Sequence, residues 1–228
     1  MSKIPDNFID FICADFPYNI SGNGGLTMKG DKIVKADFWE WDKWDTQEDY
    51  LEFVFKVCNK YRRILKPNGN LILFFSYRLA GRIAYELETR GLFTFRTPII
   101  LNKKNPQPHI KKTGFRSCYE MGMWLVNDGG KFSPPKTFNF LSQKEMTNVQ
   151  HYLIGKEGNK QSSHPTEKPI DIISKFIEVF TNKGDVVLDN FAWSWTTGIA
   201  AYKLERNAIS IEQDPTFIKM IHARQNKL

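Results

Sequence analysis

Hydrophobic and polar positions along this chain follow two periods, and the change from one to the other predicts its elements. Short apolar runs typical of buried strands lie at 8–14, 70–77, 92–101, 184–189 and 208–212, and 119–126 is strand-like. Helical spacing fills 46–65, 78–90, 169–181, 196–205 and 215–224, with Thr46 able to cap the first helix and Gly91 to stop the second. Strands that alternate with helices favour an α/β fold with a parallel or mostly parallel sheet.

The remaining segments read as connections. Residues 19–31 are rich in glycine with Asn and Ser, and Pro67–Gly69 has the composition of a turn. Residues 102–116 form a polar, basic loop that contains proline. Residues 127–161 show no periodicity, so we expect them to cross the surface without regular structure.

Composition narrows the class of protein without fixing it. A chain of 228 residues with 41% hydrophobic residues suits one large globular domain. Its formal net charge of +7 favours a polyanionic partner such as nucleic acid, although many basic proteins bind none. Cys13, Cys58 and Cys118 are too widely spaced for a metal-ligand pattern or a disulfide framework. Asp6 and Asp10 interrupt the N-terminal apolar residues, so we expect no secretory signal, no membrane span and a cytoplasmic setting.

The first candidate site is Asp15-Phe16-Pro17-Tyr18, at the end of the first predicted strand. Open α/β sheets bind ligands at the carboxyl ends of their strands. A carboxylate and a backbone carbonyl near residue 16 could accept both hydrogen bonds of an exocyclic amine on a nucleobase. Tyr18 could stack on a base pulled out of the duplex. The alternative is an ordinary strand end followed by an Asp-Pro type of turn.

The second candidate is residues 186–198, where an apolar strand ends at Asp189 and a tight turn leads to a helix beginning at Thr196 and Thr197. Such turns present backbone N–H groups to nucleotides. Glu212 ends the next strand at a spacing that suits ribose hydroxyls, or it is a solvated residue before a helix. A third motif, His164-Pro165-Thr166-Glu167-Lys168-Pro169, could touch a ligand or merely cap the helix after it.

Together these motifs resemble the amino-group DNA methyltransferases in their β arrangement, and the likeness covers nearly the whole chain. In family order come Asp15–Tyr18, a target-recognition segment at about 102–161, His164–Pro169, the turn ending at Gly198, and Ile211-Glu212. The stretches 38–42, 65–69 and 103–108 match in kind. The resemblance implies a single Rossmann-like domain over 1–228, with a mostly parallel sheet and helices on both faces. It is strongest with small adenine-N6 enzymes of bacterial restriction–modification systems, which would make the chain bacterial or phage-encoded.

The same resemblance implies the chemistry. S-adenosylmethionine would donate a methyl group to a flipped base, and Asp15, where cytosine enzymes carry Ser, favours adenine. The catalytic residues would be Asp15, Phe16, Pro17 and Tyr18. Cofactor contacts would come from Asp189, Phe191, Trp193, Ser194, Trp195, Thr196, Thr197, Glu212, His164, Thr166 and Lys168. DNA phosphates would meet Lys103, Lys104, His109, Lys111, Lys112 and Arg116, unless that loop is merely solvated.

The chain departs from the family pattern at its chemistry. Asn190, Trp193 and Trp195 stand where the family turn has Pro, Gly and Gly, and Phe16 replaces the first proline of the catalytic motif. If either glycine takes positive φ in relatives, tryptophan adds strain as well as bulk. These residues therefore predict that the S-adenosylmethionine pocket is blocked in this chain. Three hypotheses follow: an adenine-N6 methyltransferase, an inactive homologue that binds DNA or an active methyltransferase subunit, and a nucleotide-binding enzyme with other chemistry.

An aromatic cluster at Phe38, Trp39, Trp41 and Trp44 lies outside the candidate sites described above. It could stack on bases or form a homodimer contact, and two of its rings could instead pack in the core.

Overall fold

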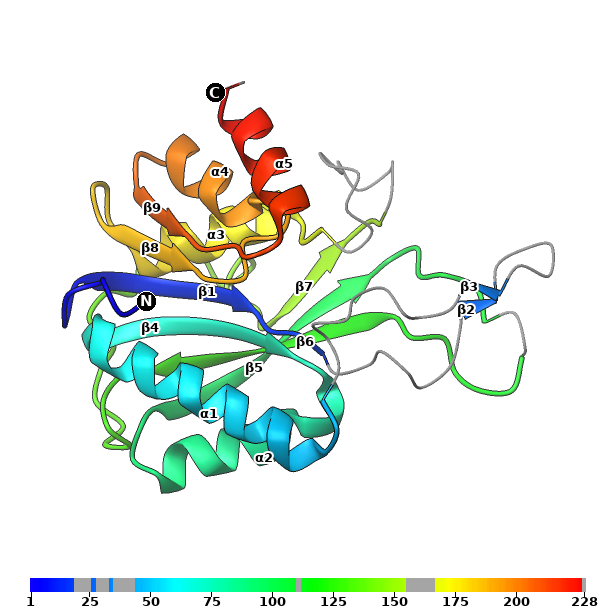
Figure 1. Ribbon diagram of the computed structural model, residues 1–228, viewed down its shortest axis with the longest axis horizontal. Helices are drawn as coiled ribbons and strands as arrows, with labels where there is room; N and C mark the ends of the chain where they lie inside the picture. Colours follow the sequence, from blue (N-terminus) through cyan, green and yellow to red (C-terminus); the bar gives the residue numbers. More distant parts are fainter. Residues whose placement is uncertain (19–25, 28–32, 35–43, 110–111, 155–166, 227–228) are drawn as a thin grey trace.

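The computed structural model describes residues 1–18, 26–27, 33–34, 44–109, 112–154 and 167–226, and its centre is a seven-stranded sheet (Figure 1). The strand order is β7-β5-β6-β4-β1-β8-β9. Strand β6 is antiparallel to β4 and β5, and the other four neighbouring pairs are parallel. The strands are β1 (Ile9–Asp15), β4 (Leu65–Phe75), β5 (Thr94–Lys103), β6 (Tyr119–Val126), β7 (Val149–Tyr152), β8 (Val186–Asp189) and β9 (Asn207–Ser210). Two short strands, β2 (Leu26–Thr27) and β3 (Ile33–Val34), pair with each other apart from this sheet.

Helices cover both faces of the sheet (Figure 1). Helices α1 (Gln47–Ile64) and α2 (Tyr77–Thr89) pack on one face, and α3 (Ile170–Phe180), α4 (Thr196–Lys203) and α5 (Pro215–Gln225) lie on the other side. Strand β1 contributes side chains to the hydrophobic cores on both faces of the sheet, because successive side chains of a strand point to opposite faces. Ile12 and Ala14 join the core under α1 and α2, whereas Phe11 and Cys13 join the core under α3. This three-layer arrangement confirms the predicted Rossmann-like α/β fold with a mostly parallel sheet.

Helix α1 begins where its sequence signal lies. The Thr46 hydroxyl accepts a hydrogen bond from the Asp49 backbone N–H, and the Asp49 carboxylate accepts one from the Thr46 N–H, each at 3.1 Å. Such a reciprocal capping box satisfies two N–H groups that the helix cannot, and a cap of this kind stabilises a protein by about 1 kcal/mol. The apolar face of α1, which includes Leu51 and Val54, is buried against the sheet. The remaining predicted helices are confirmed, with ends within about two residues.

Two predictions about connections were wrong. Pro67–Gly69 lie inside β4 and do not end it: Asn68 has a φ of 58°, and the pairing with β1 changes register between Ile9 and Phe11. The strand thus continues through these residues, with a local irregularity in its pairing with β1. The segment 127–161 contains a regular element after all, because β7 pairs in parallel with the end of β5. Four residues on a half-exposed sheet edge are too few to display a period.

In the parts of the chain described, no helix combines the length and hydrophobicity needed to cross a bilayer.

Candidate active site

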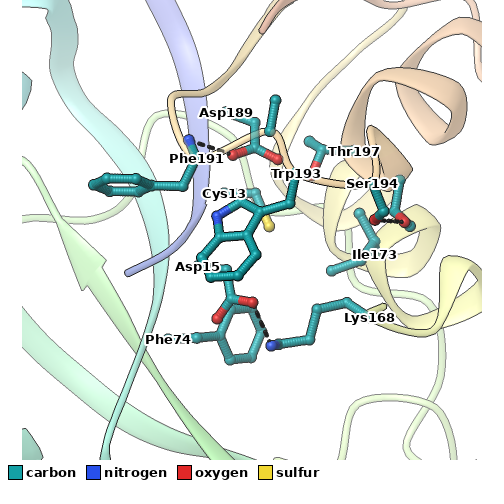
Figure 2. A pocket seen from close by; sticks show the side chains of 12 residues that line it. Cys13, Asp15, Phe74, Lys168, Ile173, Asp189, Phe191, Trp193, Ser194 and Thr197 are labelled. Carbon is teal, nitrogen blue, oxygen red and sulfur yellow. Dashed lines mark hydrogen bonds and ion pairs between the residues drawn. The ribbon is translucent and has the colours of Figure 1, made fainter. Parts of the chain in front are cut away.

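The sheet brings two of the sequence-predicted motifs together. Strands β1 and β8 are parallel neighbours, so Asp15 and Asp189, which end them, reach the same edge of the sheet. Both carboxylates line a cavity of about 30 Å³ that Lys168 and Trp193 also line. Figure 2 shows the Trp193 indole in this cavity, with Asp189 on one side and Asp15 on the other. The other lining residues are Cys13, Phe74, Ile173, Phe191, Ala192, Ser194, Thr196 and Thr197.

Asp15 forms a partly buried ion pair with Lys168. The Lys168 ammonium lies 2.5 Å from Asp15 Oδ2, and it donates to the Tyr18 hydroxyl at 3.3 Å. Burial raises the pKa of Asp15 even though Lys168 opposes the shift. Burial also raises the pKa of the Tyr18 phenol well above its usual value, so this group stays neutral. Asp15 Oδ1 is buried and has no hydrogen-bond partner within the described residues, which leaves one oxygen able to accept a bond from a ligand.

Phe16 belongs to the core. Its side chain is 1% exposed, and its ring packs at centroid distances of 4.5 Å from Phe75 and 4.8 Å from Phe191. Its backbone N–H donates to the Phe74 carbonyl at 3.1 Å, a bond that the family's proline could not make. The Tyr50 hydroxyl donates to the Pro17 carbonyl at 2.7 Å. Phe16 therefore fixes the backbone of the motif by packing and a hydrogen bond, which replaces the restraint of a proline ring.

Asn190 has a similar structural explanation. Its side-chain oxygen accepts a hydrogen bond from the buried Tyr61 hydroxyl, across the gap between α1 and the turn after β8. The preceding Asp189 accepts a bond from the Phe191 N–H at 3.1 Å. Burial raises the pKa of Asp189 to about 7, although hydrogen bonds from Thr197 and Phe191 work against the shift.

Trp193 lies in the turn after β8, and its side chain lines the cavity. Its φ is 33°, which lies in the region that favours glycine. Its backbone N–H donates to Glu212 Oε2 at 2.9 Å, and its ring stacks against Phe217 at a centroid distance of 6.3 Å. The other Glu212 oxygen accepts from the N–H groups of Gln213 at 2.7 Å and Asp214 at 2.9 Å. Both oxygens of the carboxylate predicted to bind ribose are thus engaged by backbone.

Trp195 is built into the start of α4. It is the N-cap residue with a φ of 61°, its side chain is 7% exposed, and its indole N–H donates to Ser210 Oγ at 3.0 Å. The ring lies directly over Gly198, where an added Cβ would fall 1.9 Å from the indole nitrogen. Trp195 therefore requires glycine at 198, and it does not line the cavity.

The helix start also depends on two residues that the sequence did not single out. Glu167 pairs with Arg224 of α5 at 3.0 Å and accepts from the Thr196 hydroxyl at 3.2 Å, with both charged side chains nearly buried. The Ser194 and Thr196 hydroxyls are bonded to each other at 3.0 Å. Glu167 could have been found as the acid inside the third motif, whereas Arg224 is brought there only by the packing of α5. His164 and Thr166 lie outside the described residues.

The basic loop between β5 and β6 divides into two groups. The Lys103 ammonium turns inward and pairs with Glu120 at 2.9 Å, with 21% of its side chain exposed. Arg116 is exposed, and its guanidinium donates to the carbonyls of Pro106 and Gln107. Lys104 and Lys112 are also exposed, and His109 is half-buried. Phe115, which belongs to no sequence motif, is fully exposed in the same loop. Lys111 lies outside the described residues.

Of the aromatic cluster, Trp44 packs on the core with ring centroids 4.9 Å from Tyr50 and 5.3 Å from Phe53. Phe38, Trp39 and Trp41 are outside the part of the chain that the structure describes.

Comparisons with known proteins concern the chain as a whole. The family model described as DNA methylase, which covers N6 and N4 methyltransferases, matches residues 9–223. Over its whole length the chain is 31% identical to the type II methyltransferase M2.MboI of Moraxella bovis, and it covers 84% of that protein. It is 30% identical to the type II methyltransferase M2.DpnII of Streptococcus pneumoniae, in an alignment that covers 98% of this chain and 85% of that protein.

Two solved structures show the same fold. The crystal structure of the M1.HpyAVI–SAM complex is 27% identical with a TM-score of 0.66, over 95% of this chain and 88% of that one. The cytosine-N4-specific PvuII DNA methyltransferase has a TM-score of 0.74 at 16% identity, over 98% of this chain and 81% of that one. The latter likeness concerns the fold alone.

Proposed function

Since this chain belongs to the DNA methylase family, we propose that its substrate is an adenine in DNA and that Asp15 receives the N6 amine of that base. The observation that carries the proposal is Oδ1 of Asp15, which is buried at the wall of the cavity and has no hydrogen-bond partner in the part of the chain that the structure describes. A buried acceptor without a partner is costly, and a ligand N–H would satisfy it. The relatives M2.MboI and M2.DpnII are type II methyltransferases, which agrees with a DNA substrate.

The chemistry required of the protein is modest. The lone pair of an exocyclic amine is delocalised into its ring, so the nitrogen is a poor nucleophile. Acceptance of one N–H by Asp15 and of the other by the Phe16 carbonyl favours a pyramidal nitrogen with its lone pair exposed. Tyr18, held neutral and close to Lys168, can stack on the flipped base.

S-adenosylmethionine, the methyl donor of this family, does not fit the cavity as Trp193 leaves it. The volume of about 30 Å³ is roughly a tenth of the smallest usual ligand pocket, at about 300 Å³. Glu212, the family's ribose ligand, is already engaged by three backbone N–H groups. Asp189 ends β8 and α4 begins at Thr196, in the order of the family's motif, and the obstructing Trp193 lies in the turn between them.

The small volume of the cavity favours a second candidate function, which is binding without methyl transfer. In that case the chain would hold DNA, as a homodimer or with an active methyltransferase subunit. Its DNA contacts would be the exposed basic residues of the β5–β6 loop, with Phe115 available to stack on or between bases.

Nucleoside analysis decides between the substrates and between the functions. Unmethylated DNA is incubated with S-adenosylmethionine and either the natural chain or Trp193→Gly, then digested and analysed by mass spectrometry. We expect N6-methyladenine from Trp193→Gly and none from Trp193→Gly combined with Asp15→Ala. Formation of N4-methylcytosine would refute adenine as the substrate. DNA binding with neither product would establish the second candidate.

The DNA surface has its own test. Replacing Lys104 and Lys112 with alanine should reduce the slope of log binding constant against log salt by about 1.4–1.8, since each phosphate contact contributes about 0.7–0.9. The matched control is Lys60→Ala, an exposed lysine on α1, which should leave the slope unchanged. An equal effect of the control would show that only net charge matters.

A further inference from the structure

The Lys168 ammonium is shared between two carboxylates that come from different strands. It lies 2.5 Å from Asp15 Oδ2 at the end of β1 and 3.0 Å from Glu120 Oε2 in β6. Only 10% of the Lys168 side chain is exposed, so water screens these attractions weakly. Glu120 is not part of any motif that the sequence displayed.

Glu120 is held in place from its other side. Its Oε1 lies 2.9 Å from the Lys103 ammonium and accepts a hydrogen bond from the Tyr152 hydroxyl at 2.9 Å. The three residues stand side by side on β6, β5 and β7, since Glu120 is paired with Leu101 and Lys103 is paired with Tyr152. Because both of its oxygens have partners, the Glu120 carboxylate is held in place, and its negative charge attracts the Lys168 ammonium.

The network is electrically balanced, with two carboxylates and two ammonium groups. Burial works to raise the pKa of Glu120, but Lys168 and Lys103 outweigh it and lower the value to about 2. Glu120 thus stays ionised at the pH values at which proteins are usually assayed. Asp15, by contrast, keeps Oδ1 buried without a hydrogen-bond partner among the described residues, and its counter-ion Lys168 contacts Oδ2.

We propose that Glu120 is a positioning residue of the candidate active site. By taking part of the Lys168 ammonium, it keeps Asp15 from being fully neutralised and leaves Oδ1 free to accept the amine N–H of a bound base. The identity of that amine rests on the proposed function, whereas the charge sharing rests on the distances alone. The proposal also links Asp15 to the end of β5, where the predicted target-recognition segment begins, and to β7, which lies within that segment.

Titration of Asp15 tests the charge sharing without DNA or cofactor. Carbon-13 NMR of chains labelled at the aspartate carboxyl carbon gives its midpoint, with the resonance assigned by Asp15→Asn. The ionisable groups that act on or respond to Asp15 are Cys13, Tyr18, Glu120, Tyr152, Lys168 and Asp189. Glu120→Gln removes a like charge and releases Lys168 to Asp15, so the midpoint should fall by about one pH unit or more.

A second variant should move the midpoint the other way. Lys103→Met leaves the charge of Glu120 uncompensated on one side, so the Asp15 midpoint should rise. Glu145→Gln, which breaks the Lys175 pair at 2.6 Å elsewhere, is the matched control and should change nothing. A midpoint that stays within about 0.3 units of the natural chain in both network variants would overturn the charge-sharing proposal, since a merely structural role would not move it.

Kinetics separate this proposal from the substrate assignment. In the Trp193→Gly background, Glu120→Gln should lower kcat at least about tenfold, a loss of about 1.4 kcal/mol, and leave KM for DNA unchanged. A change in KM alone would overturn the positioning role. If the Trp193→Gly background has no activity at all, the substrate proposal fails, and the NMR shifts still decide the charge sharing.

Discussion

Trp193→Gly is the substitution that most directly tests whether this chain closes its own cofactor site. The indole lines the cavity and its residue has a φ of 33°, so glycine both removes the obstruction and suits the backbone. The backbone N–H that donates to Glu212 is retained in glycine. The change therefore alters volume and strain while keeping the hydrogen bond that anchors the turn.

The expected size follows from the burial of the ring. A ligand that enters the natural chain must first displace the indole, and exposing a large apolar side chain costs about 1.5–3 kcal/mol. Each 1.4 kcal/mol corresponds to a factor of about ten in a dissociation constant. Trp193→Gly should therefore bind S-adenosylmethionine about 10–100 times more tightly than the natural chain.

Calorimetry with S-adenosylmethionine measures the effect, and the neighbouring tryptophan supplies the control. Trp195→Gly deletes the same side chain two residues away, but that ring packs on Gly198 outside the cavity. It should not tighten binding, and it should lower the free energy of unfolding by about 1–4 kcal/mol: about 3–5 for a lost buried ring less about 1–2 for relieved left-handed strain. A micromolar or tighter dissociation constant for the natural chain, or equal gains in both variants, would refute the closed cavity.

Two further predictions concern the same turn. Gly198→Ala should cost about 2–4 kcal/mol of folding stability because it displaces a buried ring. In the Trp195→Gly background the same change should instead stabilise the protein by about 0.5–1 kcal/mol, because alanine has the higher helix propensity. Urea unfolding of the double-mutant cycle measures both effects, and additive effects would contradict the contact. Asp189 has a folded pKa of about 7 against an ordinary value of 3.8, so the folded state binds more protons between these values and stability should fall as pH rises from about 4 to 7. Asp189→Asn should remove on the order of 2–4 kcal/mol of that loss between pH 4 and pH 8, and an unchanged pH dependence would show that Asp189 is not the group responsible.

Local signals in the sequence were enough for most of the framework. Runs of apolar residues located the main strands, Thr46 located the start of α1, and the alternation of strands with helices gave the fold class, because each depends on neighbours in the chain. The order of the motifs led to the family. The meeting of Asp15 with Asp189 also follows from sequence, since parallel strands end at one edge of the sheet.

The state of the site was decided by contacts between segments far apart in the chain. Only packing shows that the Phe16 ring lies in the core and that Asn190 accepts a hydrogen bond from the Tyr61 hydroxyl. Packing also shows that the Trp195 ring needs glycine at position 198. Glu120 carries no local signal, because its importance comes from a lysine 48 positions later, and the antiparallel strand β6 and the segment just before α3 bring the two side chains to 3.0 Å. Sequence determined which chemistry could stand at this edge of the sheet, and tertiary structure decided which atoms there remain free, because burial and pairing are properties of the assembled chain.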